Sequence, residues 1–341
     1  MKTMIFLAAA LLMSALAMFG PRWALQTSGV TARLRGVSAV NERVAWASGS
    51  GATVLRTNDG GATWKKLTVT TETLDFRDID AIDAQTAYVL SIGNGPASRI
   101  YKTTDAGATW TMQFKSDDQK VFLDAMSFWD ANHGIVFGDS VAGQLYILTT
   151  DNGGRSWTRV PPASLPPALE NEGAFAASGT NIALFGKTHA WIGTGAGARA
   201  RVLRTTDRGR TWQVADTLLA AGPSTGIFSI AFRDAKHGVV VGGDYRKEQE
   251  AVDNLAVTSD GGVTWKLVKG LSGFRSVVAY VPGAKTPTLV ALGPSGGDYS
   301  LDDGQTWSRI EGPGFDTFSF VAHKPTGWAA GANGALGKLV L

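Results

Sequence analysis

Five charged residues recur at one position of a repeated strand pattern, and their side chains are the best candidates for chemistry. Aligning LRGVSAV, FRDIDAI, LDAMSF, FRSVVAY and FDTFSF brings together Arg35, Arg77, Asp124, Arg275 and Asp316. Arginine binds carboxylates and phosphates through paired hydrogen bonds. A ring of alternating charge also satisfies itself through ion pairs between neighbouring strands. The pattern therefore leaves two interpretations, a binding ring and a structural network.

Segments found in single repeats add polar groups near this ring. An insertion, PPASLPPALENEGAF, precedes one of the strands and carries Glu172, and the loop GTGAGARAR carries Arg201. Two other repeats end a strand in GDS and GGDYR, with Asp139 and Asp244. These loops emerge on the face where the inner strands begin, so we expect the groups to converge. The predicted ligand- or partner-binding set is Arg35, Arg77, Arg275, Asp124, Glu172, Asp139, Asp244 and Arg201.

A phrase that occurs six times marks the elements that position these residues. The copies are TNDGGATW, TTDAGATW, TDNGGRSW, TTDRGRTW, TSDGGVTW and SLDDGQTW. Each describes a tight hairpin turn, in which Asp caps backbone amides, Gly supplies a positive φ and Trp fills an apolar slot. We assign structural roles to Asp59, Trp64, Asp105, Trp110, Trp157, Asp207, Trp212, Asp260, Trp265, Asp302 and Trp307. In the third copy either Asn152 or Asp151 stands at the Asp position, and we expect a distorted turn.

The phrase resembles the Asp-box, or bacterial neuraminidase repeat, of the sialidase-like superfamily. That resemblance implies an all-β propeller, and repeat intervals of 42 to 55 residues suit blades of four antiparallel strands. A seventh unit at about 315–341 supplies three strands and lacks the phrase. The segment at about 22–29 begins RWALQTS and is similar to a strand that follows the phrase. We therefore predict a seven-bladed β-propeller whose last blade is closed by the N-terminal strand.

Composition and the first residues bound the class of protein. The chain has 341 residues, of which 42 are Gly and none is Cys, so disulfides are excluded. Its net charge of +3 is small and does not indicate nucleic-acid binding. Residues 1–17 join Lys2 to an apolar run and small residues, a pattern typical of an export signal. An uncleaved N-terminal anchor is the alternative. With cleavage, residues 18–341 form one periplasmic or extracellular domain, without a membrane span and expected to be a monomer.

No metal or cofactor motif occurs in the sequence, so neither group is expected. Ten of the eleven Trp fall at repeat positions and only Trp129 is left over, which gives little support to a sugar-binding platform. The histidines also fall mainly in repeated turns, so we assign them no catalytic role.

Two functions follow from resemblance. Phrases such as LRGVSAVNERVAWASGSGATVLRTNDGGATW resemble the photosystem II stability/assembly factor family. That resemblance implies a non-catalytic propeller that binds a partner protein or a small acidic ligand at the channel mouth, with Arg35, Arg77 and Arg275 as the first residues to test. The alternative is a sialidase-like glycoside hydrolase, in which Asp124 and Glu172 supply the two carboxyl groups. The sequence has neither the Arg-Ile-Pro phrase typical of sialidases nor an identifiable Tyr-Glu pair, and both absences count against the hydrolase alternative.

Overall fold

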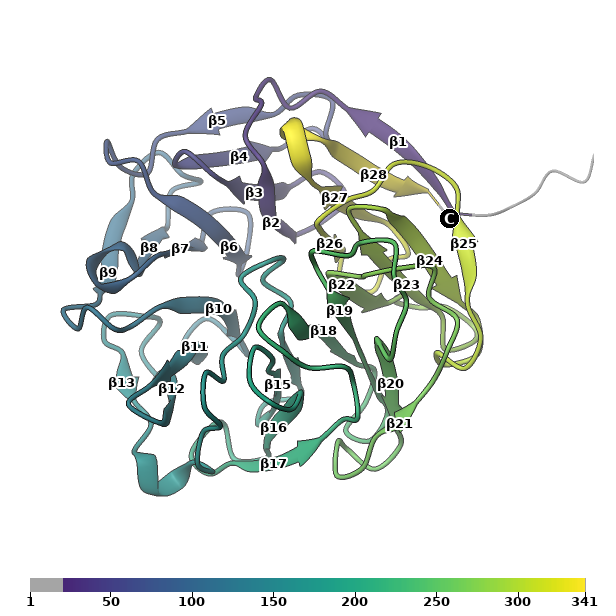
Figure 1. Ribbon diagram of the computed structural model, residues 1–341. Coiled ribbons are helices and arrows are strands. Elements are labelled where there is room, and N and C mark those ends of the chain that lie inside the picture. The colour runs from purple at the N-terminus through teal and green to yellow at the C-terminus, as the bar shows by residue number, and fades with distance from the viewer. Residues whose placement is uncertain (1–20, 341) are drawn as a thin grey trace, which may run out of the picture.

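The computed structural model describes residues 21–340, so the predicted export signal at 1–17 lies outside the described residues. The described strands form seven four-stranded antiparallel sheets, placed around a common axis like the blades of a propeller (Figure 1). This confirms the predicted fold. No helix in the described part is long and apolar enough to span a membrane.

Each sheet is one blade, and its strands run in chain order from the axis outwards, except that β1 joins the last blade. Blade 1 contains β2 (Leu34–Ala39), β3 (Ala45–Gly49), β4 (Thr53–Thr57) and β5 (Lys65–Leu67). Blade 2 contains β6 (Asp75–Ala81), β7 (Ala87–Ile92), β8 (Arg99–Thr103) and β9 (Thr111–Lys115). Blade 3 contains β10 (Leu123–Phe128), β11 (Gly134–Val141), β12 (Gln144–Thr150) and β13 (Thr158–Arg159).

The second half of the ring follows the same order. Blade 4 contains β14 (Ile182–Phe185), β15 (His189–Gly193), β16 (Arg201–Thr205) and β17 (Gln213–Asp216). Blade 5 contains β18 (Thr225–Phe232), β19 (Gly238–Asp244), β20 (Leu255–Thr258) and β21 (Lys266–Leu267). Blade 6 contains β22 (Val277–Tyr280), β23 (Leu289–Gly293), β24 (Gly296–Ser300) and β25 (Ser308–Ile310). Blade 7 contains β26 (Thr317–Phe320), β27 (Gly327–Ala330), β28 (Leu336–Val340) and β1 (Arg22–Gln26). Three short 3-10 helices, η1 (Gly95–Ala97), η2 (Pro162–Ser164) and η3 (Ala332–Gly334), lie in loops.

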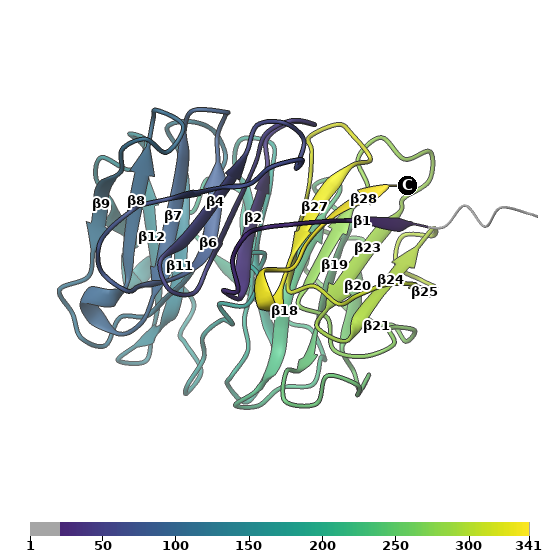
Figure 2. The same cartoon turned by 90° about the horizontal axis from the view of Figure 1, so that it is seen from above.

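The N-terminal strand closes the ring, as predicted. β1 pairs antiparallel with β28 along its whole length, and Figure 2 shows the two strands side by side. The indole ring of Trp23 lies 4.8 Å from the ring of Phe315 and 5.9 Å from that of Phe318, measured between ring centroids. The first described strand thus shares the apolar core of blade 7, and the outer edge of β28 is covered.

Large aromatic side chains on the second strands hold neighbouring blades together. Trp46, Tyr88, Trp191 and Trp328 are fully buried there. Tyr88 of blade 2 stacks on Phe128 of blade 3 at 4.0 Å, and Trp191 of blade 4 stacks on Phe232 of blade 5 at 3.6 Å. Trp129 also joins two blades, since its Nε1 donates to the carbonyl of His189 at 2.9 Å. Apolar burial between sheets is thus the main force that fixes the ring.

Five of the six repeated turns have the same hydrogen-bond pattern. Oδ1 of Asp59 accepts from the backbone N of Thr63 at 3.0 Å, and Oδ2 accepts from its hydroxyl at 2.6 Å. These bonds from Thr63, with a further one from Thr57, lower the pKa of Asp59 to about 2. The same contacts recur at Asp105, Asp207, Asp260 and Asp302.

The third turn is not distorted, contrary to expectation. Asn152 takes the Asp position, and its Oδ1 accepts from the backbone N of Ser156 at 3.0 Å. Its Nδ2 donates to the Ser156 hydroxyl at 2.8 Å, at the place where the other copies have a hydroxyl donating to a carboxylate. The amide preserves the turn because it reverses the direction of one hydrogen bond.

Side-chain acceptors also connect the inner strands of adjacent blades. Oδ2 of Asp78 accepts from the backbone N of Met126 at 2.7 Å, and Oδ2 of Asp80 accepts from that of Phe128 at 2.9 Å. Burial raises the pKa of Asp80 to about 6. Serines do the same elsewhere: Ser38, Ser229 and Ser319 accept from Ala81, Val278 and Ala39. These bonds fix the spacing of the strands that carry the candidate site.

Candidate functional site

A cavity of about 580 Å³ lies where the inner strands begin. Its charged and aromatic linings come from different blades. We call Arg33, Arg35 and Arg77 of blades 1 and 2 the cationic wall, and Asp124 and Asp139 of blade 3 the carboxylate corner. We call Phe175, Phe228, Tyr245 and Phe274, which lie in or beside blades 4 to 6, the aromatic wall. Asp316 and Glu248 also contribute to the lining.

Residues 174–180, which run from the end of the blade 4 insertion towards β14, lie beside this cavity and are called the crossing segment. Nη1 of Arg35 donates to the carbonyl of Ala177 at 3.3 Å, and Nη1 of Arg77 donates to that of Ala176 at 3.0 Å. On the other side, the hydroxyl of Ser178 donates to the carbonyl of Ser276 at 2.7 Å, and Thr317 donates to the carbonyl of Ser178 at 2.9 Å. This crossing segment is therefore bonded to blades 1, 2, 6 and 7.

The cationic wall contains one incompletely neutralised charge. Arg33 donates from Nε and Nη2 to the two oxygens of Asp316, each at 2.8 Å. Arg77 pairs with Asp75 at 2.8 Å. Nε of Arg35 lies 3.9 Å from the same Asp316 and, among the described residues, has no hydrogen-bond partner. Burial lowers the pKa of Arg35 to about 10, and the neighbouring charges of Arg77 and Arg33 add to that effect. Arg35 thus stays charged at neutral pH with an incomplete set of acceptors.

The carboxylate corner contains two acidic groups that no described basic side chain neutralises. Asp124 is 1% exposed, and neither of its oxygens completes a hydrogen bond among the described residues, although the backbone N–H of Ala174 is near enough to act against the rise of its pKa. Burial and the nearby charge of Asp139 raise the pKa of Asp124 well above its usual value. Burial also raises the pKa of Asp139 to about 6. Within the described part of the chain neither carboxyl group forms an ion pair, so no cation stabilises its charged form.

We expect Asp124→Asn to raise the melting temperature at neutral pH. An acid whose folded-state pKa is raised favours folding below its unfolded pKa of about 3.9, and this contribution is lost as pH rises through the folded pKa. The melting temperatures of Asn variant and wild type should therefore lie close together near pH 4 and separate as pH rises. Thermal denaturation at several pH values measures the gap, and a gap that is constant from pH 4 to pH 8 would contradict the prediction.

Of the eight predicted binding residues, the structure brings Arg35, Arg77, Asp124 and Asp139 to the cavity. It does not bring the other four. Arg275 is fully buried, and its Nε donates to Oδ2 of Asp298 at 2.7 Å, inside blade 6. Its side chain points away from the cavity because that acceptor lies on β24 of its own blade. Asp244 accepts from the backbone N of Arg246 at 3.0 Å in a turn.

Glu172 and Arg201 form a second buried pair outside the cavity lining. Nε of Arg201 donates to Oε1 of Glu172 at 2.8 Å, and Nη2 bonds the other oxygen. The Thr194 hydroxyl and the backbone N of Leu169 also donate to this carboxylate, at 2.8 Å and 2.9 Å. The carboxyl pair of the hydrolase alternative, Asp124 with Glu172, therefore does not face one common space.

Sequence reasoning missed most of the lining, including the charged residues Arg33 and Glu248 and the aromatic residues Phe122, Phe175, Phe228, Tyr245 and Phe274. Arg33 carried a signal, because ARLRG places it two residues before Arg35 and alternate residues of an extended chain share a face. The aromatic residues carried none, since each also fits the apolar pattern of a blade core.

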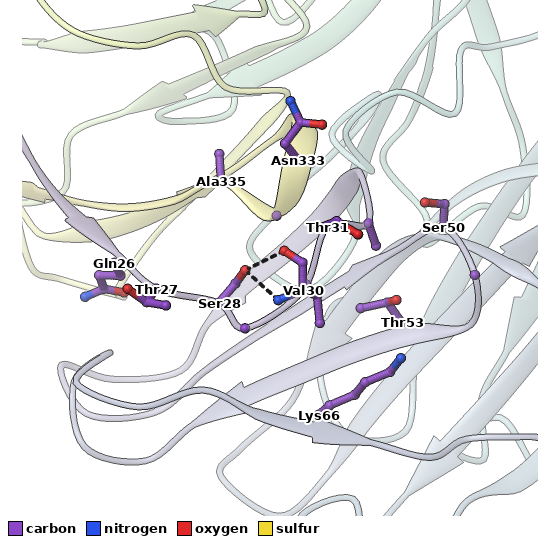
Figure 3. A pocket seen from close by; sticks show the side chains of 14 residues that line it. Gln26, Thr27, Ser28, Val30, Thr31, Ser50, Thr53, Lys66, Asn333 and Ala335 are labelled. Atoms are coloured by element: carbon purple, nitrogen blue, oxygen red, sulfur yellow. Dashed lines mark hydrogen bonds between the residues drawn. The ribbon is translucent and has the colours of Figure 1, made fainter.

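A larger, open hollow of about 860 Å³ lies between blades 7 and 1 (Figure 3). Its side chains are mostly short and polar, and the hydroxyl of Ser28 bonds within its own loop to the backbone of Val30 at 3.2 Å. Lys66 is the one charged side chain in its lining. The hollow therefore lacks the paired groups that binding or acid-base chemistry requires.

No protein-family model and no curated protein matches the chain. Several solved structures do match the chain. A structure described as YCF48 bound to D1 peptide is 19% identical, with a TM-score of 0.66 over 94% of this chain and 97% of that one. Virginiamycin B lyase from Staphylococcus aureus is 13% identical, with a TM-score of 0.68 over 94% and 100%. The GH74 xyloglucanase from Xanthomonas campestris is 15% identical, with a TM-score of 0.62 over 93% of this chain and 53% of that one.

These likenesses show the propeller fold. They include a peptide-bound protein and two enzymes, and one propeller scaffold supports many functions. The function of this chain therefore has to be inferred from the residues of its site.

Proposed function

We propose that this protein is an exported, non-catalytic propeller that docks an acidic segment of a partner protein in the cavity at its channel mouth. The observation that carries the proposal is Arg35, a partly buried cation with an incomplete set of acceptors, in a cavity that is also lined by aromatic side chains. A carboxylate of the partner would complete the hydrogen bonds of the cationic wall. The apolar run at the N-terminus supports export.

The size and rigidity of the cavity favour a peptide segment. A volume of about 580 Å³ accommodates a few side chains. The ring of Phe175 stacks on that of Phe228 at 4.1 Å with an interplanar angle of 2°, and the ring of Tyr245 meets it edge-on at 6.0 Å. Rigid aromatic rings beside arginine are the composition typical of protein-binding hot spots.

Exposed apolar side chains lie on the loop that carries Tyr245 and on the loop bonded to it. Tyr245 is 42% exposed, Val252 61% and Leu218 66%, on loops that follow the outer strand of blade 4 and the second strand of blade 5. The two loops are joined, because the backbone N of Ala220 donates to the carbonyl of Asp253 at 2.8 Å. Apolar residues gathered beside a binding cavity are typical of a protein contact. The likeness to a propeller described with a bound peptide also supports this function.

Panning a phage library of random heptapeptides on the immobilised protein tests the proposal. We expect enrichment of peptides that combine Asp or Glu with Phe, Trp or Leu. Loss of charge-assisted hydrogen bonds worth about 1.5–3 kcal/mol corresponds to affinity about 10 to 150 times weaker, and we expect this for Arg35→Ala.

Arg43→Ala is the matched control, because this exposed arginine lies in the turn at the opposite end of β2. It removes the same charge and should leave peptide affinity within a factor of two. The proposal fails if no acidic family is enriched, or if enriched peptides bind equally to a folded Arg35→Ala, Arg77→Ala double variant.

A further inference from the structure

Asp124 differs from the other buried carboxylates in the described part of the chain. Asp298, Asp316 and Glu172 each bind an arginine, and Asp78 accepts a backbone N–H. Asp124 is as buried as these residues but has no arginine, and the nearby backbone N–H of Ala174 does not complete a hydrogen bond to either of its oxygens. A buried polar group without a hydrogen bond is costly and rare, so its presence in a cavity lining points to a ligand.

Asp124 and Asp139 both lie at irregularities of the blade 3 ladder, and the one at Asp124 recurs near the start of the inner strands of blades 1, 2 and 5. The β10–β11 register shifts between Leu123 and Ala125, and the β11–β12 register shifts between Gly138 and Val141. Each carboxylate thus sits at an irregularity of the ladder, where a strand redirects its side chains. Gly173 leaves room for Asp139, because a Cβ at residue 173 would lie 1.7 Å from Oδ1 of Asp139.

We infer that the carboxylate corner is a subsite for an ammonium or guanidinium group, so that the docked segment carries a Lys or Arg as well as its acidic residue. This inference rests on the proposed function. The oxygens of two neighbouring carboxylates match the three donors of an ammonium or the five of a guanidinium. The apolar stem of such a side chain would lie along aromatic rings, which also attract cations.

A metal ion fits this corner less well than an organic cation. A calcium ion takes six to eight oxygen ligands, and the described residues contain no group of three or more His, Cys, Asp or Glu side chains able to hold a metal. Two carboxylates on one wall, facing arginines and aromatic rings on the others, suit a side chain that enters from the cavity.

The heptapeptide selection tests the inference with Asp124→Asn, Asp139→Asn as the variant. We expect wild-type protein to enrich Lys or Arg together with Asp or Glu, and the variant to keep the acidic preference while losing the basic one. In a selected peptide, replacing Lys by norleucine should weaken binding to wild type at least tenfold and change binding to the variant less than twofold. Equal losses on both proteins would overturn the inference and leave the acidic docking site intact.

A small probe tests the subsite even if no peptide is selected. Phenethylammonium should bind wild type and raise its melting temperature, whereas the neutral 2-phenylethanol should not, and the double variant should respond to neither. Asp117→Asn, at an exposed residue in the loop before β10, is the matched control and should respond like wild type. Binding of phenethylammonium to the double variant with unchanged affinity would overturn the inference.

Discussion

Replacing Trp23 by alanine lowers the free energy of unfolding by about 2–4 kcal/mol. Trp23 is partly buried between β28 and the rings of Phe315 and Phe318, so its loss exposes the core of blade 7. The estimate lies somewhat below the 3–5 kcal/mol of a fully buried tryptophan. Thermal and urea denaturation followed by tryptophan fluorescence measure the change.

Removal of residues 22–26 has a still larger effect, because it also breaks the pairing of β1 with all of β28 and opens an unpaired edge in the ring. Leu25→Ala is the matched control on the same strand. Leu25 is 67% exposed, so its truncation should change stability by less than about 0.5 kcal/mol. An unchanged melting temperature after the deletion would show that the ring does not depend on β1.

Arg275→Met destabilises the protein by about 3–5 kcal/mol, the usual result of removing one partner from a buried ion pair. Asp298 would remain about 1% exposed and charged without its arginine. The carbonyl of Phe274 would also lose the donor that now lies 2.7 Å away. Urea denaturation midpoints measure the loss of stability. A double variant distinguishes the cost of the unpaired Asp298 charge from the cost of losing the buried arginine side chain.

Arg275→Met combined with Asp298→Leu should recover most of the lost stability, since an apolar pair of similar volume often replaces a buried ion pair without cost. Peptide affinity should stay unchanged in the double variant, because Arg275 does not line the cavity. A variant that is stable but has lost peptide binding would instead return Arg275 to the binding site.

The repeats made the fold predictable from sequence, and the same repeats limited what could be predicted of the site. A repeated phrase marks six of the seven blades, and RWALQTS reveals the closing strand because it is similar to strands elsewhere in the chain. Alignment of repeats places Arg35 and Arg275 at one position, yet it cannot show that Arg275 has an acceptor, Asp298, inside its own blade. The direction of a side chain depends on such partners, which are distant in sequence and carry no pattern.

The blade 4 insertion shows a second limit. Its charged residue Glu172 attracted the prediction, but the residues that reach the cavity are Phe175 and the small residues around it. Arg35 and Arg77 bind backbone carbonyls of the residues that directly follow this insertion. Every residue type has a carbonyl, so contacts of this kind leave no signature in the sequence.

The crossing segment at 174–180 connects several blades inside the ring. Because it is bonded to blades 1, 2, 6 and 7 while belonging to blade 4, the mouth cannot widen unless several of these bonds break together. The span between the cationic wall and the carboxylate corner is therefore nearly constant. In a docking protein, a cavity of fixed width selects segments by the distance between their charged side chains as well as by the sign of those charges.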